Sequence, residues 1–186
     1  MQYEQELRDI IQKQPEFLEI CQIVASLHLP EATICAGAVR NLVWDNQTKQ
    51  PSSLIRNNID VYYKNTSESF EKYLTRQALL QQKYPKYLWN LNNIALPKRH
   101  TNQQYFGKTI TETIAHFPEQ CSAIGVTPDT LGNFNLVAPY GLNDIFEMKV
   151  QPTPYFAPDT AQYPTYQKRM QRKNWHKFWP NLTIEK

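Results

Sequence analysis

Near the start of the chain, apolar residues recur every three or four positions. They include Leu7, Ile10, Ile11, Phe17, Leu18, Cys21, Val24 and Leu27. This spacing places them on one face of an α-helix, and Pro15 interrupts the pattern because proline lacks a backbone N–H. The segment therefore predicts two amphipathic helices that break near Pro15.

The middle of the chain alternates between strand-like and helix-like segments. Short apolar or β-branched runs predict strands at 32–35, 59–63, 87–96 and 134–138. Amphipathic runs predict helices from 38 to about 44, from a cap at Ser67 through Leu80, and over 109–116 and 142–148. Residues 46–57 are polar and turn-rich and predict a loop. Strands separated by helices predict a sheet with helices packed on it.

The last part of the chain has a different character. Prolines between 151 and 163 prevent regular structure, and an aromatic-basic helix is predicted from about Thr165 to Phe178. The length of 186 residues is enough for one domain with a small appendage. We therefore predict one domain over 1–150, with 151–186 forming a Pro-rich segment and a C-terminal helix packed on the same domain.

Charge is distributed unevenly along the chain. The net charge is +3, but residues 164–179 contain no acid and five bases, Lys168, Arg169, Arg172, Lys173 and Lys177. Aromatic residues at 175, 178 and 179 share another face of the same predicted helix, which favours a helix that docks by its aromatic face and keeps its charges in water. The alternative is that this basic tail binds single-stranded nucleic acid through stacking and phosphate contacts.

Cysteines and histidines give no sign of a metal centre. Cys21, Cys35 and Cys121 are widely spaced and form no CxxC pair, and the four histidines are scattered. Neither a disulfide framework nor a zinc site is therefore expected. No apolar run approaches the roughly 18 residues of a transmembrane helix. We expect a cytoplasmic protein with no membrane partner.

A glycine stands between a predicted strand and a predicted helix, in the sequence Ile34-Cys35-Ala36-Gly37-Ala38-Val39-Arg40-Asn41. At such a turn, backbone N–H groups can approach a phosphate, and the helix N-terminus adds positive potential. Arg40, in the first helical turn, adds a fixed positive charge. By itself, the pattern also fits a tight turn followed by a surface arginine.

Polar and apolar residues alternate at the start of the strand at 59–63. Asn58 and Asp60 point to one face of the strand, whereas Ile59 and Val61 point to the core. Oxygen-bearing side chains in this position suit Mg²⁺, which prefers hard oxygen ligands. The pattern also fits a polar edge that precedes a core strand.

Together, these motifs resemble the nucleotidyltransferase superfamily that includes DNA polymerase β and the CCA-adding enzymes. The stretch 37–41 is similar to the Gly-x-Val-Arg-Asp stretch of the CCA-adding group, and 58–60 is similar to the Asp-x-Asp pair on the next strand. The chain resembles a small bacterial family of nucleotidyltransferase-like proteins more closely still. That resemblance covers nearly the whole chain from about Thr33, in the stretches 36–45, 57–61, 138–146, 150–154 and 175–180.

The resemblance implies an α/β (α+β) fold with a mixed sheet flanked by helices. It implies that a nucleoside triphosphate, as substrate, is bound by Gly37, Ala38, Arg40 and Asn41. It also implies that Asp60 and Asn58 are the catalytic pair and hold Mg²⁺ or Mn²⁺. The implied reaction transfers a nucleotide to an acceptor hydroxyl on a small molecule, a protein or an RNA.

The chain departs from the family pattern at the first position of the metal pair, where Asn58 stands in place of aspartate. An amide offers one neutral oxygen, so the change weakens a divalent site. A third carboxylate is not evident on the strand at 87–96, and Asp45 and Asp144 are the candidates to replace it. Two hypotheses therefore stay open: a Mg²⁺-dependent nucleotidyltransferase, and a catalytically decayed nucleotide- or partner-binding module on the same fold.

Overall fold

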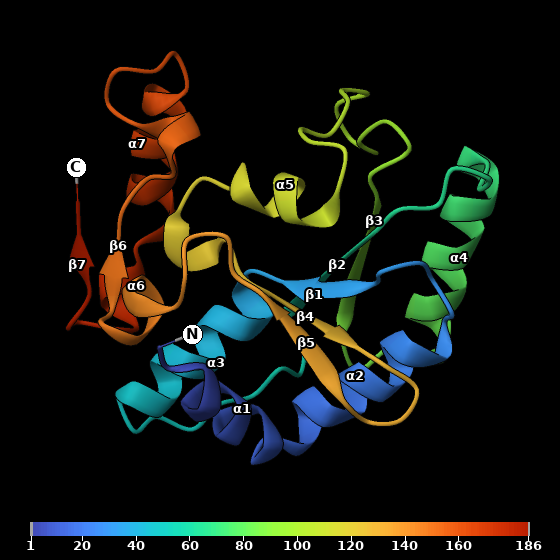
Figure 1. The fold of residues 1–186 in the computed structure, drawn as a ribbon, viewed down its shortest axis with the longest axis horizontal. Helices are drawn as coiled ribbons and strands as arrows, with labels where there is room; N and C mark the ends of the chain where they lie inside the picture. The colour runs from blue at the N-terminus through green and yellow to red at the C-terminus, as the bar shows by residue number, and fades with distance from the viewer. Residues whose placement is uncertain (1, 186) are drawn as a thin grey trace.

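A five-stranded mixed sheet lies at the centre of the computed structural model, which describes residues 2–185 (Figure 1). The strand order is β3-β2-β1-β4-β5. Strands β2 and β3 run parallel, and the other neighbouring pairs run antiparallel. The strand bounds are β1 Thr33–Cys35, β2 Asn58–Tyr63, β3 Leu88–Asn93, β4 Gly125–Pro128 and β5 Phe134–Val137.

Helices cover both faces of the sheet. Their bounds are α1 Glu4–Gln12, α2 Pro15–Ser26, α3 Gly37–Gln47, α4 Phe70–Lys83, α5 Ile110–Ala115, α6 Asn143–Phe146 and α7 Tyr163–Lys173. Short 3-10 turns occur at Gln120–Ser122, Pro154–Phe156 and Trp175–Lys177. In Figure 1, α1, α2 and α3 lie below the sheet and α5 lies above it. A separate pair of short parallel strands, β6 Lys149–Val150 and β7 Thr183–Ile184, lies beside α6.

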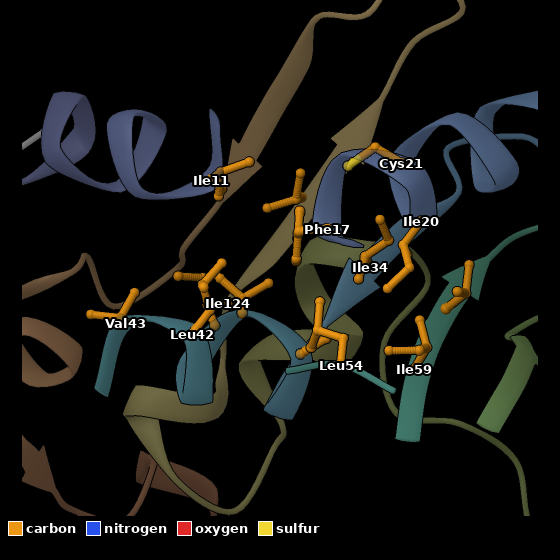
Figure 2. Close-up of a cluster of buried hydrophobic side chains, with 14 of the residues drawn as sticks. Ile11, Phe17, Ile20, Cys21, Ile34, Leu42, Val43, Leu54, Ile59 and Ile124 are labelled. Atoms are coloured by element: carbon orange, nitrogen blue, oxygen red, sulfur yellow. The ribbon is translucent and has the colours of Figure 1, made fainter. Parts of the chain in front are cut away.

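The main hydrophobic core fills the space between the sheet and the first three helices. Figure 2 shows Phe17 and Ile20 of α2 close to Ile34 of β1 and Ile59 of β2, and all four are fully buried. The same core extends to Trp175, Trp179 and Leu182 near the C-terminus. A second cluster packs α5 against the opposite face of the sheet, around Cys35, Ile94, Ile110, Ile114 and Ala123. In β2, Ile59, Val61 and Tyr63 are buried in the main core and alternate with less buried residues on the other face.

A tight turn joins β1 to α3. Ala36 adopts φ 55° and ψ −119°, a positive-φ conformation that a non-glycine residue rarely holds without support. Its N–H donates to the Ile124 carbonyl at 3.0 Å, and its carbonyl accepts from the Arg40 N–H at 2.9 Å. These bonds fix the turn, so α3 begins at Gly37, directly after the strand.

The sequence-based elements agree with the structure in order and type, with four differences. The α4 helix is capped by Ser69, whose side chain accepts from the Lys72 N–H at 3.2 Å, rather than by Ser67. Strand β4 and the β6–β7 pair were not predicted. The last helix begins at Tyr163 and ends at Lys173, five residues before the predicted end.

Among the described residues, no helix has the length and apolar character needed to cross a membrane.

The chain turns sharply after α7. Asn174 adopts a left-handed conformation with φ 47°, which ends the helix. The ring centroids of Trp175 and Trp179 then lie 5.4 and 5.0 Å from that of Trp44 on α3. Phe178 is 56% exposed, so the prediction that all three aromatic residues of this segment dock together is wrong for Phe178.

Candidate functional site

The register of β1 and β2 brings the two predicted motifs together. Cys35, at the end of β1, is the antiparallel partner of Asp60 on β2. The turn at Gly37 follows Cys35 by two residues, so it lies beside the face of β2 that carries Asn58 and Asp60. The three residues line one cleft.

This cleft has a volume of about 510 Å³, a size typical of small-molecule sites. It is walled by the β1–α3 turn, the start of β2, the loop before β2 and the C-terminal segment. Its lining residues are Ala36, Gly37, Arg40, Asn41, Asp45, Ser52, Ser53, Leu54, Asn57, Asn58, Asp60, Arg169, Lys173, Trp175, Phe178 and Trp179.

Asp60 is the carboxylate on the strand face beside the Gly37 turn. Its Oδ1 accepts a 2.6 Å hydrogen bond from the Asn90 side chain on β3. Burial raises the pKa of Asp60, while the Asn90 hydrogen bond and the positive charges of Lys173 and Arg169 lower it, and burial has the larger effect. Asp60 is therefore a partly buried acid with basic neighbours.

The cleft offers few anionic oxygens to a metal ion. Asn58 is exposed and offers only an amide oxygen, and the β3 residue paired with Asp60 is Asn90, another amide. Within residues 2–185, no three histidine, cysteine, aspartate or glutamate side chains come together in a way that would hold a metal ion. Of the two candidate substitutes for a third acid, Asp45 lines the cleft, where Trp179 Nε1 donates to it at 2.9 Å. Asp144 lies outside it and accepts from Gln151 at 2.8 Å.

Arg40 lies in the cleft wall, but most of its guanidinium is enclosed. The side chain stacks between two indoles, with Cζ 4.8 Å from the Trp44 ring centroid and 4.3 Å from that of Trp175. It donates to Ser122 Oγ at 2.6 Å and to Asn41 Oδ1 at 2.8 Å. Arg40 is only 4% exposed, so it contributes mainly charge and support to the cleft, with its donors already engaged.

Two bases of α7 line this same cleft, whereas a helix docked by its aromatic face is predicted to keep its charges in water. Arg169 forms an ion pair with Glu119, which is fully buried and also accepts from Ser122 at 2.6 Å. Lys173, one turn later, has no ion-pair or hydrogen-bond partner among residues 2–185. The four-residue spacing of Arg169 and Lys173 is visible in the sequence, but the sequence does not show that their side chains point to the cleft.

The start of α3 offers backbone donors to the cleft. The N–H groups of Gly37 and Ala38 have no acceptor among the described residues, and α3 has no side-chain N-cap. Ala38 itself is buried, so only its backbone can take part, whereas Asn41 lines the cleft. A helix N-terminus with free N–H groups favours an anion.

Solved structures share this arrangement of sheet and helices. One protein, whose NMR structure is described as revealing a CCA-adding enzyme head domain, superposes with a TM-score of 0.84 at 29% identity, covering 98% of this chain and 95% of the other. A CCA-adding enzyme in complex with CTP matches with a TM-score of 0.62 at 11% identity over 97% of this chain. The Thermotoga maritima CCA-adding enzyme complexed with tRNA matches with a TM-score of 0.61 at 11% identity, again over 97% of this chain.

The fold and cleft thus define a nucleotidyltransferase-type head domain. Residues 22–184 match the model of a nucleotidyltransferase family, and the chain belongs to this family. This confirms both the predicted family and the predicted fold class. The chain spans 43% and 42% of the two CCA-adding enzyme chains named above. No curated protein matches the sequence.

Proposed function

We propose that this protein binds a nucleoside triphosphate in the cleft between α3, β2 and α7. The observation that carries the proposal is that the free N–H groups at Gly37, the Lys173 ammonium and the Arg169 guanidinium line one cleft. Three sources of positive potential in one concave site suit a chain of phosphates.

An exposed aromatic ring in the lining of the cleft suits the base. Phe178 is 56% exposed although its neighbour Trp179 is buried, and its backbone carbonyl accepts from Gln50 at 2.9 Å, which fixes this part of the chain. Stacking of a base on an aromatic side chain is worth about 1–3 kcal/mol. A triphosphate at Gly37 with its base on Phe178 would use both the backbone donors and the exposed ring of the cleft.

Titration calorimetry of the full chain with ATP, CTP, GTP and UTP tests the proposal. We expect at least one nucleotide to bind, and Phe178→Ala to weaken that binding about tenfold. Leu131→Ala is the matched control, because Leu131 is 85% exposed at the tip of the β4–β5 hairpin and outside the cleft. Absence of binding by all four nucleotides, with and without a divalent cation, would refute the proposal.

The residues present do not fit a pair of catalytic metal ions. Such a pair needs several anionic oxygens, and the strand face beside Gly37 offers one carboxylate, Asp60, and one amide, Asn58. The other acid of the cleft, Asp45, accepts from the Trp179 indole. Arg40, Arg169 and Lys173 add three positive charges to the same cleft. The geometry therefore favours a nucleotide-binding module over a two-metal enzyme.

Nucleotide transfer to an acceptor hydroxyl is the second candidate function. It is favoured by membership of the nucleotidyltransferase family and by the position of Asp60 beside the Gly37 turn. Pyrophosphate release from a bound nucleotide, measured with Mg²⁺ or Mn²⁺ and a panel of acceptors, tests it. Turnover that appears only in Asn58→Asp would support a decayed site, and turnover in the wild type would establish an enzyme.

A further inference from the structure

The charges that line the cleft are mostly positive. Three bases, Arg40, Arg169 and Lys173, line the cleft together with two acids, Asp45 and Asp60, while the buried Glu119, which pairs with Arg169, lies outside the lining. The bases come from α3 and from α7, which are far apart in sequence and meet only in the fold. A site for a free divalent cation has the opposite balance, because acidic ligands outnumber bases around it.

Both acids of the cleft already have a hydrogen-bond donor. Asp60 accepts from the Asn90 amide, and Asp45 accepts from the Trp179 indole at 2.9 Å. The neighbouring amides, Asn58 on the same face of β2 and Asn90 on β3, carry no charge. A metal ion at Asp60 would therefore gain a single carboxylate group, already partly engaged by Asn90, in a cleft that also holds the positive charge of Lys173.

The bases, in contrast, are held in place for an anion. Glu119 is fully buried and pairs with Arg169, and its other contact, Ser122, accepts from Arg40 at 2.6 Å. This network fixes two guanidinium groups in the wall of the cleft. Lys173 extends from the last turn of α7 and has no partner within residues 2–185. Its charge is thus available to a ligand.

We propose that the cleft binds the phosphate chain of its nucleotide without a divalent metal. The positive charges of Lys173 and Arg169 neutralise the phosphates, as the ion does in metal-dependent sites. The inference rests on the proposed nucleotide binding and adds the form of the ligand, a metal-free nucleoside di- or triphosphate. The free triphosphate carries more negative charge than its magnesium complex. The basic cleft therefore binds the free form at least as tightly.

Calorimetry of the full chain in two buffers tests this inference, one with EDTA and one with saturating Mg²⁺, using the nucleotide that binds best. We expect equal or tighter binding in EDTA. Binding that is tenfold tighter with Mg²⁺, or that requires it, overturns the inference and leaves the proposed function standing. No binding in either buffer overturns both.

Charge variants of α7 provide the second part of the test. Lys173→Met should weaken binding in EDTA at least tenfold, and Lys173→Arg should keep most of it. Lys168→Met removes the same charge from the same helix outside the cleft, and it should change affinity less than twofold. Both positions are exposed, so folding is not at risk. Equal losses in Lys173→Met and Lys168→Met would overturn the assignment of Lys173.

Asp60 separates the two binding modes directly. If a metal bridges Asp60 to the phosphates, Asp60→Asn should abolish the binding that is measured in the Mg²⁺ buffer. If Lys173 and Arg169 bind the phosphates themselves, Asp60→Asn removes a negative charge from the cleft and should leave affinity in EDTA unchanged or increase it. Loss of binding by this variant in EDTA, with thermal stability retained, overturns the inference.

Discussion

Asn90 lies directly across the parallel β2–β3 pair from Asp60, and its amide donates a 2.6 Å hydrogen bond to the Asp60 carboxylate. The hydrogen bond stabilises the charged form of a partly buried acid. It also fills, with a neutral donor, the position from which a second acid would face Asp60.

Changing Asn90 to aspartate should therefore destabilise the protein. Two carboxylates would meet at hydrogen-bond distance, and the folded state should lose about 1–3 kcal/mol at neutral pH. Urea denaturation measures the loss, and Mn²⁺ should recover part of it by binding between the two acids. Asn90→Leu, which removes the hydrogen bond without adding charge, is the control and should not respond to Mn²⁺. An Asn90→Asp variant as stable as the wild type would contradict the prediction.

The buried Glu119–Arg169 pair should be important for stability. Glu119 is fully buried, and Glu119→Gln would leave Arg169 without its counter-charge, at a cost of about 3 kcal/mol. The exposed pair Lys149–Glu185 is a matched control, since Glu185→Gln should cost less than about 1 kcal/mol. Chemical denaturation compares the two. Equal effects would show that the buried network has no special role.

Stability at low pH should depend on Glu68. Burial raises the pKa of Glu68, but the hydrogen bonds from Tyr63, Arg76 and Asn93 together lower it by a larger amount. The pKa therefore lies below its ordinary value of 4.5. The unfolded chain then takes up a proton first as pH falls. The stabilising contribution is complete above about pH 4.5 and is lost as pH falls through the lower pKa of the folded state.

Urea denaturation at pH 7 and at steps down to pH 3 measures this contribution. Glu68→Gln should be less stable than the wild type at pH 7, and the difference should shrink as pH falls. Tyr63→Phe removes one of the donors at 2.6 Å and should lose part of the same pH dependence. A difference between wild type and Glu68→Gln that stays constant with pH would contradict this account.

A methyl group at Gly37 should block the ligand without harming the fold. A Cβ at this position would lie 3.8 Å from Arg40 Nη2 and 3.9 Å from Asn41 Nδ2, both ordinary contacts. Gly37→Ala should therefore keep or slightly raise thermal stability, because alanine favours a helix by about 0.5–1 kcal/mol over glycine. Its nucleotide affinity should fall about tenfold or more. Unchanged affinity would place the phosphates away from this turn.

Much of the fold could be predicted from local pattern. The alternation of Asn58, Ile59, Asp60 and Val61 indicated both the strand and its buried face, and the structure has Ile59 and Val61 fully buried. Strand β4 was missed because its short run, Gly125–Pro128, contains a glycine and a proline and is a strand only through pairing with β1 and β5. Tertiary pairing of this kind has no local signature.

The candidate site was predictable only where its residues carry local motifs. The Gly37 turn and the pair at 58 and 60 carry local motifs, and the β1–β2 register then joins them. The direction of Lys173 and Arg169 depends on where α7 stops. Asn174 ends the helix in a left-handed conformation, so Trp175 packs on Trp44 independently of the helix face that carries the bases. A continuous helix through 178 would have predicted the opposite arrangement.

The enclosure of Arg40 between Trp44 and Trp175 limits how the chain can be shortened experimentally. Because Trp175 supplies one of the two rings, deletion of the residues after Asn174 would uncover a buried cation and open the core around α3 at the same time. Such a truncation would remove binding and folding together and would reveal nothing about either. Single substitutions on α7 avoid this difficulty, since they leave the indole enclosure complete.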